Sequence, residues 1–196
     1  MKLLLGTTNQ GKLKEAKQLL SDLKFDLLSL DDLENLPEII VEENGETFAE
    51  NALLKAQAYG HLSGILTLAE DAGLEVNTLD GKPGVKSARL GVNADVRNRK
   101  LLSLLKNKKD RSARFVSVFC LYDPQTKKTD YFRGEIEGKI STELKGNQGF
   151  DYDYLFIPEG YEQTFAELGV KVKNKISHRR QAIEKLKTLM LSLLGE

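Results

Sequence analysis

Short apolar runs alternate with helical patterns of apolar residues through the first half of the chain. Lys2–Leu5 and Phe25–Leu28 are brief apolar runs, which predict buried strands, and an extended segment is predicted at Glu38–Val41. Two other segments repeat apolar residues at helical spacing: Leu13, Ala16, Leu20 and Leu23 in one, and Phe48, Ala52, Ala56 and Tyr59 in the other. Thr47 and Glu50 have capping-box spacing at the start of the second helix.

The second half of the chain is richer in strand patterns and closes with a helix. Arg114–Tyr122 alternates and Thr129–Ile140 continues after a turn, so we expect an antiparallel pair. Ser177–Leu194 predicts the last helix, with its apolar side chains inward (Ile183, Leu186, Met190 and Leu193). This order of elements indicates an α/β domain with a mixed sheet.

The length of 196 residues suits a single domain, residues 1–196, built of two lobes. The residues with candidate chemistry come from widely separated segments, and clefts between lobes are common ligand sites. We therefore expect such a cleft to bring these residues together.

Composition narrows the class of protein. The 29 basic and 29 acidic residues balance, so no overall field indicates nucleic acid or an anionic membrane as a partner. Cys120 is the only cysteine, which excludes an intramolecular disulfide and a cysteine-cluster metal site. The first apolar run is too short for a signal peptide, and no stretch approaches the roughly 20 apolar residues of a membrane helix. We expect a soluble, cytoplasmic protein.

Ile65–Val76 is the segment with the clearest candidate chemistry. Its apolar residues lead to two adjacent carboxylates, Glu70 and Asp71, at a predicted glycine-containing turn. Neighbouring negative charges repel unless a cation, a basic group or water stabilises them. A metal site and a proton-transfer site are both consistent with this pattern.

Gly6–Lys12, with the sequence GTTNQGK, follows the first predicted strand and opens the first helix. Its backbone N–H groups, hydroxyls, amides and lysine suit a phosphate. The segment matches GxxxxGK, but Leu13 stands where a P-loop has the Ser or Thr that binds magnesium. A capped loop with a surface lysine is the alternative.

Further carboxylates and a basic cluster add to the candidates. Glu42 and Glu43, like Glu70 and Asp71, offer oxygen ligands suited to Mg²⁺, although acidic pairs are usually solvated turns. Near the C-terminus, basic residues stand at the predicted start of the last helix, where the helix dipole disfavours them: Lys173, Lys175, His178, Arg179 and Arg180. We therefore expect an anion or a polar ligand there, with a solvated basic helix start as the alternative.

Histidines and aromatic residues add less specific signals. His61, the other histidine, is expected at the surface, and the lack of a histidine pair argues against zinc. Phe150, Tyr152 and Tyr154 alternate, so one face of this segment would offer a ring to a planar ligand, unless all three belong to the core.

Six motifs occur together in the order and spacing of one family: GTTNQGK, ETFAENALLKA, EDAGLEV, GKPGVKSAR, GFDYD and KNKISHRRQA. By these motifs, from Gly6 to Ala182, the chain resembles the inosine triphosphate pyrophosphatase family, the RdgB-like non-canonical purine nucleotide pyrophosphatases. The resemblance implies a Mg²⁺-dependent homodimer that hydrolyses XTP, ITP and dITP to the monophosphate and pyrophosphate, which removes them from the nucleotide pool. It also implies an elongated α/β body with a central cleft between two lobes.

The resemblance assigns roles to particular residues. Those that it implies for the triphosphate are Thr7, Thr8, Asn9 and Lys12, with Gln10 and Gly11 in the same loop and Lys55 nearby. Glu43 and Asp71 match the metal site, and Asp71 is also the implied base for the attacking water. The implied base pocket comprises Phe150 and Asp153, with Tyr152 in the same motif, and Lys173, His178 and Arg179. Ser87 and Arg89 match a further substrate-facing motif.

Two positions depart from the family pattern. Asp151 stands where the family usually has glycine, and its side chain would alter the loop or crowd the base pocket. Ala72 replaces a common Ser or Thr after Asp71, which removes a hydroxyl that could touch substrate. The first departure bears on base affinity and the second on a secondary contact.

Two rival functions remain open. A P-loop kinase or ATPase would use GxxxxGK with Glu70 and Asp71 as a Walker B segment, but Leu13 argues against it. A nucleotide-binding sensor without catalytic activity would bind nucleotide tightly without turnover in Mg²⁺.

Overall fold

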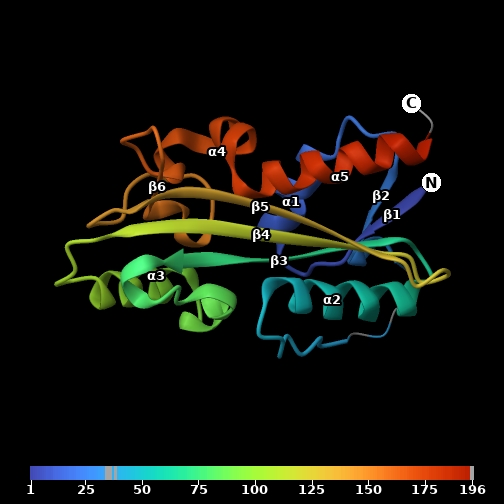
Figure 1. Ribbon diagram of the computed structural model, residues 1–196, viewed down its shortest axis with the longest axis horizontal. Helices are drawn as coiled ribbons and strands as arrows, with labels where there is room; N and C mark the ends of the chain where they lie inside the picture. The colour runs from blue at the N-terminus through green and yellow to red at the C-terminus, as the bar shows by residue number, and fades with distance from the viewer. Residues whose placement is uncertain (34–36, 38, 195–196) are drawn as a thin grey trace. The chain divides into compact units, whose positions relative to one another are not determined.

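A computed structural model describes residues 1–33, 37 and 39–194, and its six strands form one mixed sheet in the order β2-β1-β3-β4-β5-β6 (Figure 1). The strands are β1 (Lys2–Leu5), β2 (Asp26–Ser29), β3 (Thr67–Val76), β4 (Ser112–Tyr122), β5 (Thr129–Ile140) and β6 (Phe156–Pro158). β1 is parallel to β2 and to β3, whereas β5 and β6 are antiparallel. The predicted α/β class with a mixed sheet is confirmed.

The helices flank this sheet (Figure 1). They are α1 (Gln10–Leu19), α2 (Phe48–Ser63), α3 (Ala94–Leu104), α4 (Phe165–Ile176) and α5 (His178–Leu194), with short 3₁₀ helices η1 (Leu30–Asp32), η2 (Asn77–Leu79), η3 (Gly84–Leu90) and η4 (Asp151–Tyr154). The capping box of α2 is present, because the Thr47 side chain accepts from the Glu50 N–H and Glu50 accepts from the Thr47 N–H.

Residue contacts divide the chain into two compact units. The first comprises Met1–Asp71, Ser117–Gly134 and Gln181–Glu196, and the second comprises Ala72–Val116 and Glu135–Arg180. Each unit has its own apolar core, and β3, β4 and β5 contribute residues to both units.

The core of the first unit shows the alternation of a strand. Leu68 packs with residues of α1 and α5, whereas its neighbour Ala69 packs with Ala52 and Ala56 of α2. Successive side chains of a strand point to opposite faces of its sheet. In this unit α1 and α5 therefore cover one face of β3, and α2 covers the other (Figure 1).

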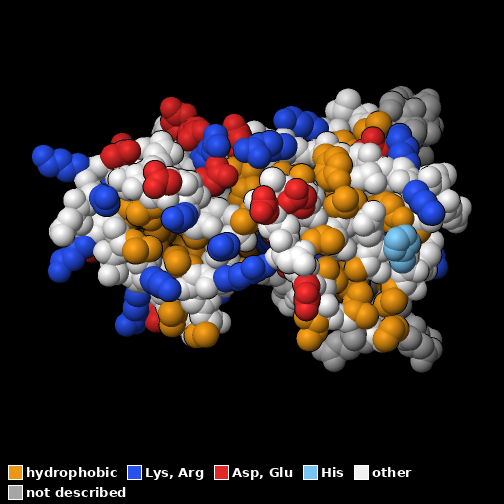
Figure 2. All heavy atoms as spheres, turned by 60° about the horizontal axis from the view of Figure 1, so that its bottom comes forward, with side chains coloured by type: hydrophobic (Ala, Val, Ile, Leu, Met, Phe, Trp, Pro, Cys, Tyr) orange, Lys and Arg blue, Asp and Glu red, His pale blue; other side chains and the backbone are white. Residues whose placement is uncertain are grey.

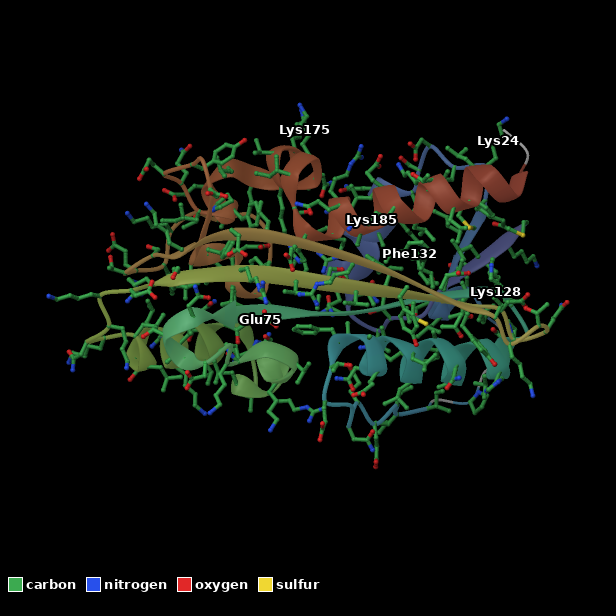
Figure 3. All side chains as sticks on the ribbon, viewed as in Figure 1. Lys24, Glu75, Lys128, Phe132, Lys175 and Lys185 are labelled. Atoms are coloured by element: carbon green, nitrogen blue, oxygen red, sulfur yellow. The ribbon has the colours of Figure 1, made fainter. Side chains whose placement is uncertain are left out.

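The hairpin of β4 and β5 carries part of this core. It is closed by the Asp123 N–H, which donates to the Lys128 carbonyl at 3.0 Å. Phe132 of β5 lies in the apolar core, and Lys185 of α5 donates to the Arg133 carbonyl at 2.7 Å (Figure 3). The predicted pairing of these two segments is confirmed.

Two predictions about local structure were wrong. The turn expected at Glu70 and Asp71 does not exist, because β3 continues through both residues to Val76 with β1 and β4 as its neighbours in the sheet. The expectation that the helix dipole disfavours the basic cluster fails for Lys173 and Lys175, which precede α5 as predicted but lie in the last turn of α4, where the dipole favours cations. His178, Arg179 and Arg180 form the first turn of α5 as predicted. The signal for α4 was the capping box of Thr164 and Glu167.

Smaller differences concern the ends of elements. The second strand begins one residue later than predicted. The segment with alternating aromatic residues forms η4, with Phe150 as its N-cap. Residues 39–41 form neither helix nor strand. Glu38 and the side chain of Leu193 lie outside the described residues.

Charged side chains lie on the surface, whereas the single cysteine is buried. Acidic and basic side chains are interspersed over the face shown in Figure 2 and do not form a patch of one charge there. Cys120 is buried, and burial raises the pKa of its thiol to about 12. None of the helices in the described parts of the chain is both long enough and apolar enough to cross a membrane.

Candidate functional site

A lysine and two carboxylates meet in the first unit. The capping box starts α2 so that Lys55 faces β3, and only 8% of its surface is exposed. Lys55 Nζ contacts Glu43 Oε2 and lies 3.4 Å from Asp71 Oδ1. The structure thus brings together Glu43, Lys55 and Asp71, three of the residues predicted from the sequence.

Asn51, one turn before Lys55 on α2, connects Asp71 with the acidic loop. Its side-chain Nδ2 donates to Asp71 Oδ2 at 3.2 Å, and its Oδ1 accepts from the Gly45 N–H at 2.8 Å. A Cβ at Gly45 would lie 2.7 Å from Glu50 Cβ and 2.8 Å from the same Oδ1, so a larger residue there would force these groups to shift. Sequence reasoning missed Asn51 as a site residue, although its helical spacing from Lys55 was the available signal.

Asp71 is a buried carboxylate with a perturbed ionisation. Burial raises its pKa, the charges of Lys55 and Lys12 lower it, and the charge of Glu43 raises it again; the net direction is upward. Carboxylates with such a shift bind protons or cations more readily than free aspartate does. This side chain is therefore suited to accept a proton or to bind a cation.

Glu70 lies on the other side of β3 from Asp71. Adjacent strand residues face opposite ways, and Glu70 Oε1 accepts from the Ser117 hydroxyl at 2.6 Å. Glu42 is exposed. Of the four predicted metal ligands, the structure therefore groups only Glu43 and Asp71.

Two grouped carboxylates fit some cations better than others. The described residues contain no group of three or more His, Cys, Asp and Glu placed to hold a metal. Mg²⁺ is commonly held by one or two carboxylates and takes its other ligands from water and phosphates, so Glu43 and Asp71 fit this ion.

The loop Gly6–Lys12 joins β1 to α1. Asn9 Oδ1 accepts from the Lys12 N–H at 3.0 Å and caps α1, and Thr7 Oγ1 accepts from the Asn9 N–H at 3.2 Å. Thr8, Asn9 and Gln10 are exposed, whereas Thr7, Gly11 and Lys12 are half-buried. This loop thus presents polar side chains at a helix N-terminus, where anions are favoured.

The second unit holds a buried ion pair beside an aromatic ring. Lys173 Nζ donates to Asp153 Oδ2 at 2.6 Å, and both side chains are almost fully buried. The same oxygen accepts from the Phe150 N–H at 2.9 Å. Lys173 Nζ and Arg179 Cζ lie 4.5 and 5.8 Å from the centre of the Phe150 ring, within cation–π range.

His178 and Arg179 begin α5 and are both buried. The His178 ring stacks on Phe115 with centroids 4.7 Å apart and planes 14° apart, which fixes the orientation of the imidazole. Of the predicted base-pocket residues, Lys173 contacts both Phe150 and Asp153, and Arg179 lies near the Phe150 ring.

The remaining predicted residues of the second unit lie around η3. The Ser87 hydroxyl donates to the Gly84 carbonyl at 2.6 Å and accepts from the Leu74 N–H at 2.9 Å, so it holds η3 to β3. Tyr152 is buried and donates to the Ser87 carbonyl at 2.8 Å. Arg89 is exposed, and Ala72 is half-buried on β3.

Comparison with known proteins identifies the relatives of this chain. The Ham1 family matches residues 3–189. The chain belongs to the Ham1 family. The dITP/XTP pyrophosphatase of Aquifex aeolicus is 42% identical to this chain over 198 residues, and the alignment covers 95% of each chain. The dITP/XTP pyrophosphatase of Desulforamulus reducens is 46% identical over 190 residues, and the alignment covers 94% of this chain and 93% of that relative.

Solved Ham1 structures have the same fold. The Staphylococcus aureus Ham1 protein superimposes with a TM-score of 0.86 at 35% identity, and 98% of this chain and 99% of that chain are covered. The HAM1 protein of Coxiella burnetii gives 0.87 at 35% identity with the same coverage. The resemblance inferred from the six motifs is confirmed.

In this Ham1-family protein, the Asn51 side chain is expected to stabilise the folded protein through its hydrogen bonds with Asp71 and Gly45. Replacing Asn51 by Leu would leave the half-buried Gly45 N–H without its side-chain acceptor and would remove the amide donor to Asp71, at a cost of about 2–3 kcal/mol in the free energy of unfolding. Urea denaturation measures this change. Gln57→Leu, at a half-buried position of the same helix, is the control and should change stability by less than about 0.5 kcal/mol. Equal effects of the two substitutions would contradict the role of Asn51.

Proposed function

We propose that this protein hydrolyses deaminated purine nucleoside triphosphates, namely XTP, ITP and dITP, to the monophosphate and pyrophosphate, and so removes them from the nucleotide pool. The observation that carries the proposal is the contact of Lys55 with Asp71 and Glu43, in a chain related to dITP/XTP pyrophosphatases. A buried carboxylate beside a lysine suits proton transfer next to a charged phosphate chain.

Phosphate binding is proposed for residues of the first unit. The loop with Thr7, Thr8, Asn9, Gln10, Gly11 and Lys12 would receive the triphosphate at the N-terminus of α1. Glu43 and Asp71 would hold Mg²⁺, with Glu42 as a further candidate in the same loop. When bound, the ion would supply neutralising charge for the phosphates and a water of lowered pKa.

In the proposed reaction Asp71 accepts a proton from the attacking water at a carboxylate oxygen. The water oxygen forms a bond to the α-phosphorus, the bond from this phosphorus to the α–β bridging oxygen breaks, and pyrophosphate leaves. Lys12 and Lys55 offset the negative charge that develops on the phosphate oxygens and on the leaving group.

Base recognition is proposed for the second unit. The Phe150 ring would stack on the purine, and His178 and Arg179 would donate to its 6-oxo group. Adenine carries an amino donor at that position, so its binding would leave buried donors unpaired. Guanine shares the 6-oxo group, so its exclusion must depend on the 2-amino group.

A nucleotide panel tests the reaction and the substrate class together. With Mg²⁺, ITP, XTP and dITP are expected to yield pyrophosphate at least about a hundredfold faster than ATP, because a site built to pair a polar group rejects analogues that cannot pair with it. Pyrophosphate and inorganic phosphate are assayed separately. Release of γ-phosphate would favour a P-loop-type enzyme, and tight binding without turnover would favour a nucleotide sensor.

The cytoplasmic location and the homodimer implied by the resemblance are part of the same proposal. The buried, free thiol of Cys120 is compatible with a reducing compartment.

A further inference from the structure

Asp151, in the middle of the GFDYD motif, has a left-handed backbone conformation. Its φ is 51°, in the region that costs most residues other than glycine about 1–2 kcal/mol and that Asp and Asn tolerate best. Contacts of both its side chain and its main chain hold Asp151 in this conformation.

Those contacts come from two successive residues of α3. Arg97 Nη2 forms an ion pair with Asp151 Oδ1, and its Nη1 donates to the carbonyl of Gly91 at 3.1 Å, beside the end of η3. Asn98, which is 2% exposed, donates from Nδ2 to the Asp151 carbonyl at 2.9 Å. α3 therefore holds Asp151 by both its side chain and its main chain.

The chain immediately before Phe150 is exposed but is held by hydrogen bonds. The Asn147 and Gln148 N–H groups donate to the Ala166 carbonyl at 3.3 and 3.2 Å, and the Tyr154 hydroxyl donates to the Gly149 carbonyl at 3.3 Å. Residues 142–149 are all exposed, and Gly146 and Gly149 both have a φ of 85°. Phe150 follows this glycine-containing segment and precedes Asp151. The Phe150 N–H is held by Asp153, and its carboxyl side is held through Asp151.

We propose that Arg97 and Asp151 form a clasp that positions the Phe150 ring for stacking on the substrate base. This inference rests on the proposed function of Phe150. Rotation of the backbone at Asp151 would displace the ring from Lys173 and Arg179, which lie over it. Arg97 and Asp151 are thus positioning residues, and they affect binding of the base more than the chemistry at phosphate.

Asp151→Asn tests the clasp without changing the backbone preference, because Asn tolerates the left-handed region as well as Asp does. The KM for ITP should rise about 5- to 20-fold, as for loss of a hydrogen bond between charged groups. The kcat should stay within about twofold, because the lost interaction contributes to binding. Arg97→Gln should behave alike, and the double variant should be no worse than either single variant, since the residues act as a pair.

The chain offers a matched control on the same helix. Arg99 pairs with Asp95 at 3.0 Å, but both side chains are mostly exposed, so Arg99→Gln should leave KM and kcat unchanged. Additive losses in the double variant, or a KM unchanged by Asp151→Asn, would overturn the clasp.

Amide hydrogen exchange of the nucleotide-free protein separates this inference from the proposed function. Asp151→Asn should accelerate exchange in residues 146–153 and not in α2. Faster exchange in a protein that fails to hydrolyse ITP would support the ordering of the loop and refute the proposed function. Unchanged exchange in a protein that hydrolyses ITP would refute the clasp and leave the proposed function standing.

Discussion

Replacing Asp71 by Asn is expected to reduce the hydrolysis of ITP by about a thousandfold, the range for loss of a general base. Asn cannot accept the proton of the attacking water, although it keeps the shape of the side chain. Because Phe150 and the phosphate loop are unchanged, binding of ITP should remain near that of the wild type. Steady-state pyrophosphate release and calorimetric binding of ITP measure the two quantities.

Glu70→Gln is the matched comparison, because Glu70 is the neighbouring carboxylate on the opposite side of β3. Gln can still accept from the Ser117 hydroxyl, so most of the turnover should be retained. Near-normal turnover in Asp71→Asn would remove Asp71 from the role of base. A larger loss in Glu70→Gln than in Asp71→Asn would contradict the assignment from strand alternation.

The same Asp71→Asn variant has an expected effect on stability. Burial raises the pKa of Asp71 in the folded state, so the folded protein favours the protonated carboxyl. The stability that this protonated group contributes is fully present below the pKa of a free aspartate, and it is lost as pH rises through the raised folded-state pKa. At neutral pH the ionised carboxylate therefore opposes folding of the metal-free protein. Asp71→Asn should be at least as stable as the wild type at pH 7, as thermal unfolding in EDTA would measure.

The second large effect is expected at Lys173, whose ammonium group is the buried partner of Asp153. Lys173→Met would remove the ammonium group that neutralises the buried Asp153 carboxylate, at a cost of about 3–5 kcal/mol in the free energy of unfolding. For a domain of this size each kcal/mol lowers the Tm by roughly 2–4 °C, so a fall of at least about 6 °C is expected. Affinity for ITP should also fall, because Phe150 loses one of its two neighbouring cations and Asp153 loses its ammonium partner.

Lys175→Met is the control for this substitution. Lys175 is in the same last turn of α4, but it is exposed and extends away from the ribbon (Figure 3). The Tm of the Lys175→Met variant should differ from that of the wild type by less than about 2 °C, as for most surface substitutions. Adding Asp153→Asn to Lys173→Met should recover part of the lost stability, because the buried charge is then gone. Equal Tm values for the two lysine variants would contradict a structural role for the buried pair.

Much of the fold could be predicted from local patterns. The strand at Lys2–Leu5, the helix that starts after Thr47 and the final helix follow from apolar periodicity and capping residues that act within one or two turns. Phe150–Tyr154 shows the limit of such patterns, because alternating aromatic residues occur there in a 3₁₀ turn and not in a strand. The contacts of Tyr152 with Ser87 and of Asp153 with Lys173 determine that turn, and both are distant in sequence.

Residue types and motif spacing alone determined the family, the α/β class and the candidate residues Lys55, Asp71 and Phe150. Only the tertiary structure decided which of these residues work together. β3 continues through Glu70 and Asp71 as a strand of the sheet, and the alternation of strand side chains places the two carboxylates on opposite faces. Likewise, the partners of Asp71 and Asp151 come from α2 and α3, and side-chain contacts between elements are not encoded in the spacing of any one segment.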